Sequence, residues 1–265
     1  MSVTDEGPER AMDILACVDG SAYAASVCEH AAWLAERLDG RIAVLHAQDG
    51  EIPKSEPDKA IWSLRSHDPL EAAKWRLRDL GATQVTGKAS PSGFPEAAIN
   101  ADADLIVMGK HGEATQDIRD ALGHSIDAVI RGSTTPVCLA PKVFLPISRG
   151  LVLLDADPEH RSALDYLRAH RRLLVRDTSL LVMFAPGQDP QPKMDIARAV
   201  LDPQGVDIAA VEAAGIDEAV AMRLETHAAD LITIARAVLS PSPEVRLQAI
   251  EARGLWGWRT PVLVC

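Results

Sequence analysis

The chain has 265 residues, enough for one large or two ordinary domains, and 47% of them are hydrophobic, as in globular proteins with a packed core. Its formal net charge of −11 disfavours non-specific binding to nucleic acid, because the chain would repel phosphate. No apolar run reaches the roughly 18 residues that a membrane helix needs, and the polar N-terminal stretch lacks a hydrophobic signal region. We therefore expect a cytoplasmic protein that binds neither membranes nor nucleic acid.

Strand and helix patterns alternate along the first half of the chain. Residues 12–18 form an apolar run typical of a buried strand, and from Ala24 to Leu38 apolar residues recur along one helix face. We expect Gly40 to end this helix, because glycine is common just after a helix. Further strands are expected at 41–47, 84–88, 105–108 and 136–140. Further helices are expected at 70–80, 95–100 and 123–131, with a loop at 48–66.

This alternation over residues 12–140 predicts a mainly parallel sheet with helices on both faces. The last strand begins with Pro136, which has no amide to donate, so we expect that strand near a sheet edge.

The same order starts again after a linker at 142–150. A strand at 151–155 ends in Asp155, much as Asp19 follows the first strand. Further strands are expected at 180–184, 207–210 and 229–232, and helices at 159–174, 194–201 and 216–227. Residues 229–232 and 259–264 echo residues 103–106 and 134–139. Two echoes in the same order indicate a tandem repeat, with domains at 12–142 and 150–265.

Residues 103–130 contain the clearest chemical signal. An apolar strand stops at Gly109, Gly112 follows, and Gly123 precedes an amphipathic segment. Glycines let the backbone approach a ligand closely, and a helix N-terminus offers unpaired N–H groups and the positive end of its dipole. This pattern predicts a site for nucleotide phosphates.

The first half resembles a universal stress protein domain. The matching residues are Ile14–Ser21, Ile42–His46, Ala103–Gly112, Gly123 and Thr135–Leu139. Residues 150–265 match this pattern only weakly, as a degenerate repeat, so the whole chain resembles a two-domain universal stress protein. The resemblance implies two Rossmann-like (adenine nucleotide alpha hydrolase-like) α/β domains, each a five-stranded parallel sheet flanked by helices.

The resemblance also implies where ATP, with Mg²⁺, would bind. In members that bind ATP, the end of the first strand lies by the nucleoside, which corresponds to Val18 and Asp19, and a residue past the histidine of the second strand contacts adenine, which corresponds to Ala47. The glycine loop holds ribose and phosphates, and its matches are Met108, Gly109, His111, Gly112 and Gly123. This location agrees with the rule that open α/β sheets bind ligands beyond the carboxyl ends of their strands.

The loop departs from the family pattern in two ways. The segment between Gly112 and Gly123 is one residue longer than in the pattern, and Gly123 is followed by His124, with Ser125 one place later. A hydroxyl at this point donates to phosphate and caps the helix, so Ser125 is the candidate donor and His124 a bulkier neighbour. The second half has no glycine pair after Ile234, and we expect no nucleotide site there.

Three functions are left open. The chain is an ATP-binding stress-response regulator or sensor, an adaptor that never binds nucleotide because His124 fills the cleft, or a slow ATPase. No catalytic motif is present. Lys110 either pairs with a phosphate or is solvated, Asp19 either touches ribose or caps the next helix, and Asp155 is expected to cap.

The remaining expectations concern single residues and partners. Cys17, Cys138 and Cys265 lie in expected strands and are interpreted as buried free thiols, and His46 as a hydrogen-bonded core histidine rather than a ligand. His111 and His124 together are a metal-site alternative. Strands Val137–Leu139 and Val262–Val264 are candidates for pairing, within one chain or in a homodimer, because open strand edges invite partners.

Overall fold

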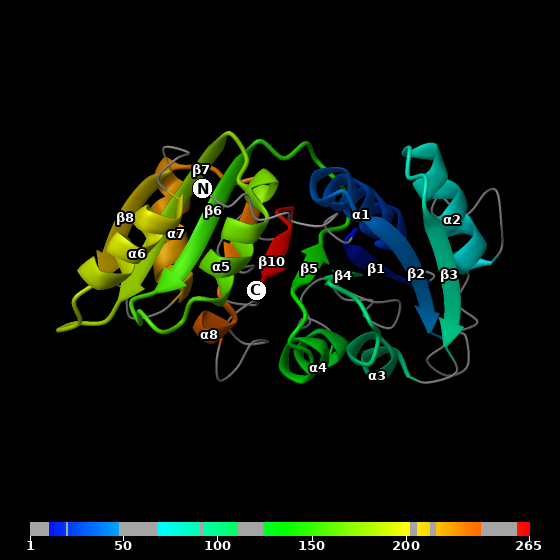
Figure 1. Ribbon diagram of the computed structural model, residues 1–265, viewed down its shortest axis with the longest axis horizontal. Coiled ribbons are helices and arrows are strands. Elements are labelled where there is room, and N and C mark those ends of the chain that lie inside the picture. Colours follow the sequence, from blue (N-terminus) through cyan, green and yellow to red (C-terminus); the bar gives the residue numbers. More distant parts are fainter. Residues whose placement is uncertain are drawn as a thin grey trace, which may run out of the picture.

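The computed structural model describes residues 11–19, 21–47, 68–90, 93–110, 124–201, 206–212, 216–239 and 259–265. Their strands form one ten-stranded sheet in the order β3-β2-β1-β4-β5-β10-β9-β6-β7-β8 (Figure 1). The first half supplies β1 (Asp13–Val18), β2 (Arg41–Ala47), β3 (Val85–Ser90), β4 (Leu105–Gly109) and β5 (Val137–Ala140). The second half supplies β6 (Arg149–Asp155), β7 (Asp177–Phe184), β8 (Asp207–Glu212), β9 (Leu231–Ile234) and β10 (Val262–Val264). The second half repeats the strand order of the first half in the reverse direction across the sheet, and the predicted tandem α/β fold is therefore confirmed.

Helices cover both faces of the sheet, as the alternating pattern predicted. The first half contains α1 (Ala24–Leu38), α2 (Pro69–Asp79), α3 (Phe94–Ile99) and α4 (His124–Gly132). The second half contains α5 (Ser162–Ala169), a 3₁₀ helix (Arg171–Leu173), α6 (Gln191–Leu201), α7 (Ile216–Thr226) and α8 (Arg236–Leu239). In the first half α1 and α2 lie on one face and α3 and α4 on the other (Figure 1). Right-handed crossovers require this split, because the chain moves outward from β1 to β3 and then returns to β4.

The two halves join through β5 and β10 at the centre of the sheet. These strands run antiparallel, with Val262 opposite Leu139 and Val264 opposite Val137. The predicted pairing of these segments is confirmed as a contact within one chain. The expectation that Pro136 places its strand near a sheet edge is wrong, because β5 lies between β4 and β10. Proline is tolerated there because it precedes the strand, and its carbonyl still accepts the amide of Ile106 at 2.9 Å.

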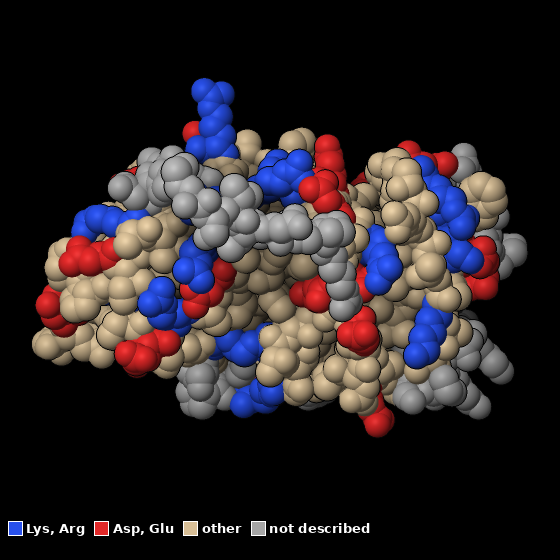
Figure 2. All heavy atoms as spheres, in the orientation of Figure 1, with Lys and Arg blue, Asp and Glu red and all other residues tan. Residues whose placement is uncertain are grey.

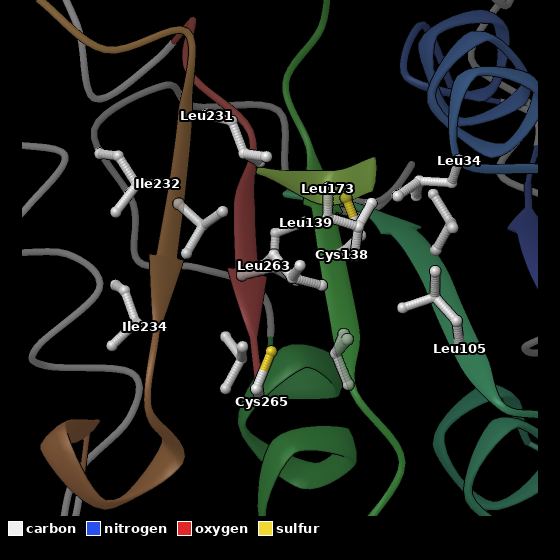
Figure 3. Close-up of a cluster of buried hydrophobic side chains, with 14 of the residues drawn as sticks. Leu34, Leu105, Cys138, Leu139, Leu173, Leu231, Ile232, Ile234, Leu263 and Cys265 are labelled. Carbon is white, nitrogen blue, oxygen red and sulfur yellow. The ribbon is translucent and has the colours of Figure 1, made fainter. Parts of the chain in front are cut away.

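One hydrophobic core runs through both halves. Buried side chains of β4, β5, β9 and β10 lie side by side, and Leu34 of α1 and Leu173 of the 3₁₀ helix belong to the same cluster (Figure 3). Cys138 and Cys265 lie in this cluster, and both are free and buried, as is Cys17, which confirms the prediction for these three; Cys28 is free and buried as well. Because the core is shared, the halves are packed as one body.

The sequence echoes mark equivalent joints in the two halves. The Asp104 carboxylate accepts the amide of Asp13 at 2.8 Å, and the Asp230 carboxylate accepts the amide of Arg149 at 3.1 Å. Each carboxylate therefore ties the turn before β4 or β9 to the start of β1 or β6. A threonine hydroxyl repeats the pattern by donating to an alanine carbonyl at 3.3 Å in each half, Thr135 to Ala103 and Thr260 to Ala229.

Two local expectations need correction. The left-handed residue that ends α1 is Asp39, with φ at 48°, and not Gly40. Gly40 is needed for space, since a Cβ there would lie 3.0 Å from the carbonyl oxygen of Met12 and 2.9 Å from a methyl of Ile14.

The helix expected at 159–174 is shorter, because it begins at Ser162 and ends at Ala169. The side chains of Asp155 and Asp157 accept amides two residues further on, and these turns occupy the residues before the helix.

Candidate functional site

The candidate site lies where the chain reverses its direction across the first half of the sheet. From β1 the chain continues outward to β3 and then crosses back to β4, so β1 and β4 are neighbours in the sheet. The chain leaves β1 for a helix on one face and leaves β4 for a helix on the other face. Ala16 is aligned with Val107, and continuing this register brings Val18 level with Gly109 at the carboxyl edge. Such a switch point is where open α/β sheets bind ligands.

The end of β1 is held by two hydrogen bonds. The imidazole Nδ1 of His46 donates to the carbonyl of Val18 at 3.0 Å, which confirms His46 as a hydrogen-bonded histidine. The half-buried Asp19 accepts the amide of Ser21 at 3.0 Å. Asp19 does not cap α1, because that helix starts at Ala24 without a side-chain cap. The carboxylate is instead fixed at the carboxyl edge by a local turn.

A pocket of about 180 Å³ opens between α3 and strands β1 to β3. Its walls combine four apolar residues, Leu15, Leu45, Ala97 and Ala101, with four polar ones, Lys88, Ser90, Glu96 and Asn100. Ala47, the expected adenine contact, ends β2 and pairs in register with Ser90. None of the nucleotide-site residues expected from the sequence is among the described residues that line this pocket.

Sequence reasoning missed these lining residues, although one signal was present. Leu45 lies two residues before Ala47 and therefore faces the same side of the sheet. The residues from β3 and α3 could be added only once the fold brought them together.

The other expected residues lie at β4 and α4. Met108 is buried, and Gly109 ends β4 and pairs with Ala140. His124 is the first residue of α4, and Ser125 is half-buried in its first turn. His111, Gly112 and Gly123 lie outside the described residues, as does the expected loop at 48–66. The structure thus brings the ends of β1 and β4 to one edge, and α4 starts there because it leads back to the beginning of β5.

Lys110 differs from its expected solvated state. Its side chain is only 1% exposed, and its amide donates to the carbonyl of Ala140 at 3.0 Å. Its charge is felt inside the protein. The pKa of His30 is lowered to about 4, mainly by burial and to a smaller extent by the Lys110 ammonium. The hydrogen bond to the Ser26 carbonyl opposes this shift. The Lys110 side chain therefore lies in the interior of the first half.

At the equivalent edge of the second half, side chains hold the turn that follows β6. Lys193 of α6 is 0% exposed, and its ammonium donates to the carbonyl of Asp157 at 2.7 Å and to that of His160. Asp155 accepts from the imidazole Nδ1 of His160 at 2.8 Å. The expected capping role of Asp155 is wrong, because α5 begins at Ser162 without a side-chain cap. Burial lowers the pKa of Lys193, while Asp155 and Asp157 oppose this shift.

The cysteines show no sign of redox or metal chemistry. Burial raises the pKa of all four thiols, to about 12 for Cys28 and Cys138. Among the described residues, no three His, Cys, Asp or Glu side chains are grouped so that they could hold a metal ion. The His111–His124 alternative falls partly outside those residues.

The surface in Figure 2 carries acidic and basic side chains in mixed order. On the described part of this face, no continuous basic area of the kind that binds a nucleic-acid backbone is visible. None of the described helices is both long and apolar enough to cross a bilayer.

Comparisons with known proteins cover both halves. The model of the Universal stress protein family matches residues 11–141. Universal stress protein Slr1230 of Synechocystis sp. is 26% identical over 252 residues, which cover 83% of this chain and 88% of that protein. Two solved structures share the fold. A universal stress protein from Archaeoglobus fulgidus superposes with a TM-score of 0.66 at 17% identity over 96% of both chains. A functionally unknown protein from Pseudomonas aeruginosa superposes with a TM-score of 0.60 at 15% identity over 96% of this chain and 92% of that one.

Proposed function

The chain belongs to the universal stress protein family as a tandem two-domain member, and from this premise we propose that its first half binds ATP with Mg²⁺ and its second half does not. The bound nucleotide fixes the conformation of residues 109–125 and so alters the surface offered to a partner protein. The protein then acts as a nucleotide-dependent regulator of a stress response.

The contrast between the two equivalent edges carries this proposal. In the first half a pocket of about 180 Å³ lies between α3 and strands β1 to β3 and reaches Ser90, which pairs with Ala47. In the second half the matching edge holds the Lys193 ammonium and the hydrogen bond between His160 and Asp155. A buried ammonium thus lies against the turn after β6, and this difference at equivalent aspartates supports a ligand site in the first half alone.

The size of the pocket suggests how the nucleotide would lie. Sites that enclose a drug-sized ligand usually measure roughly 300–1,000 Å³, so a pocket of about 180 Å³ suits the base alone. Adenine would enter beside Ala47, with ribose near Val18 and Asp19 at the open edge.

The phosphates would then extend from Met108 and Gly109 toward the glycine loop and the start of α4. There the N–H groups of Gly112, the hydroxyl of Ser125 and the positive end of the helix dipole would receive them. The loop also contains Glu113, Asp117 and Asp120, whose charges would repel a triphosphate. A bound Mg²⁺ would offset this repulsion, and so we expect affinity to require the cation.

Calorimetry with ATP and Mg²⁺ tests the proposal through paired variants. Gly112→Val places a branched side chain in the phosphate loop and should abolish binding. Asp19→Asn keeps the acceptor for Ser21 but removes the charge, and should weaken binding about 10-fold, as expected when a hydrogen bond to a charged group is lost. Asp155→Asn is the matched change in the second half and should leave the affinity unchanged.

Each alternative function predicts a different result. If calorimetry detects no heat of ATP binding with the wild type or with any variant, the nucleotide proposal is wrong and the adaptor function is favoured. A slow ATPase would be indicated by Mg²⁺-dependent phosphate release at saturating ATP. The rate would have to be proportional to the amount of purified protein and be lost in Gly112→Val.

A further inference from the structure

Arg236 is the first residue of α8, and only Ala235 separates it from β9; it corresponds to Lys110, which follows Gly109 at the end of β4. The backbone confirms the equivalence. The amide of Arg236 donates to the carbonyl of Cys265 at 2.6 Å, and the amide of Lys110 donates to that of Ala140 at 3.0 Å. In the family pattern this is a loop position next to the nucleotide, but in the second half no glycine pair surrounds it.

The side chain of Arg236 crosses from the second half into the first. Its guanidinium donates to the carbonyl of Ser133 at 2.7 Å, to that of Thr135 at 2.8 Å, and to that of Ile130. These carbonyls lie at the end of α4 and in the turn that leads to β5. The last turn of a helix has carbonyls without an intrahelical partner and the negative end of the dipole. The rigid fork of a guanidinium satisfies several such oxygens at once.

Arg236 is thus a cap for α4 that the other half supplies. Its side chain is half-buried, so the hydrogen bonds are partly shielded from water, and α8 and α4 lie on the same side of the sheet (Figure 1). The backbone of Arg236 is also held in place, because its amide donates to the carbonyl of Cys265.

We propose that Arg236 is a positioning residue for the nucleotide site of the first half. This inference rests on the proposed function, since it names a control on the same site. The α4 helix has nine residues, begins with His124 and Ser125 at the candidate site, and ends at the carbonyls that Arg236 holds. A short helix moves as a rod, so fixing one end fixes the other. The second half has lost its own loop and serves as an intramolecular partner that aligns α4.

Thermodynamic linkage gives this arrangement a second consequence. If Arg236 favours the position of α4 that binds ATP, then ATP must favour the Arg236 contact by the same factor. Binding in the first half would thereby tighten the packing of the second half against it.

Three variants separate positioning from general stability. Arg236→Met keeps most of the apolar stem but removes all donors. Arg236→Lys keeps the charge as a single point and not as a fork. Arg172→Ala is the control, because Arg172 joins the halves elsewhere, through Asp39 at 2.5 Å and Arg37, and touches no residue of α4 in the described contacts.

Two measurements are made on each full-length variant. Calorimetry gives the ATP affinity in the presence of Mg²⁺, and hydrogen exchange of residues 124–132 without nucleotide gives the order of α4. We expect Arg236→Met to weaken ATP binding by roughly 5- to 10-fold, at the lower end of usual coupling factors. We also expect faster exchange in α4, a smaller effect of Arg236→Lys, and unchanged affinity for Arg172→Ala.

The two readouts distinguish the possible failures. If the wild type binds ATP and Arg236→Met binds it equally well, the positioning role is overturned while the nucleotide site stands. If the wild type binds no ATP, the proposed function and its control fall together, and faster exchange in Arg236→Met would then leave only a structural cap. Should both Arg236→Met and Arg236→Lys fail to fold, Arg236→Gln, which keeps two amide donors on a shorter stem, takes their place. Unchanged affinity in that variant together with faster exchange in α4 would overturn the proposal, and weaker affinity would support it.

Discussion

Truncating Leu263 at the centre of the sheet should destabilise both halves together. Its side chain is 1% exposed in β10, a strand of three residues that is the link between β9 and β5. Leu263 lies opposite Cys138 on one side and next to Thr233 on the other. With paired strands on both sides, the backbone has little freedom to close the cavity left by Leu263→Ala.

The expected cost is about 3–4 kcal/mol, within the range of roughly 2.7–5 kcal/mol for buried leucines. Urea unfolding followed by circular dichroism measures the free energy of unfolding, and hydrogen exchange of β1 and β6 reports on each half. The midpoint should fall with an unchanged slope, and β1 and β6 should lose protection equally. Leu145→Ala, at a position that is 49% exposed, is the control and should change stability by less than about 0.5 kcal/mol. A loss below about 1 kcal/mol, or a loss of protection in β6 alone, would show that the halves do not share one sheet.

Three other predictions concern buried groups. The four thiols should resist Ellman's reagent at pH 8 until urea is added, because burial raises their pKa; rapid native labelling would contradict their placement. His30, with a folded pKa of about 4, binds its proton more weakly than in the unfolded chain. Stability should therefore fall by about 3 kcal/mol from pH 6.5 to 4, and His30→Gln should flatten this slope. Gly40→Ala should cost about 1–3 kcal/mol, and Ile14→Val, which removes the clashing methyl, should recover part of that loss in a double-mutant cycle.

The fold could be predicted because its signals are local or repeated. Alternation of apolar strands with amphipathic helices indicated the parallel sheet, and the two echoes proved to be the joints made by Asp104 and Asp230. The position of β5 could not be derived from Pro136, because an edge within one half becomes the centre when a second half pairs with it.

The candidate site could be predicted only where a motif adjoins a strand end. Asp19 and Gly109 are at one edge because each follows a buried apolar run. The burial of Lys110 and Lys193 could not be predicted, since nothing in their neighbouring residues distinguishes a buried lysine from a solvated one. The burial of Lys193 depends on the carbonyls of Asp157 and His160, which only the folded chain brings near it.

A crystal structure of the protein with ATP and Mg²⁺ would locate the nucleotide. We expect one molecule per chain, with its base beside Ala47 and its phosphates between Gly109 and the start of α4, and no nucleotide beside Lys193. Nucleotide density at the second half, or an edge of the first half closed by its own side chains at saturating ATP, would contradict a single site in the first half.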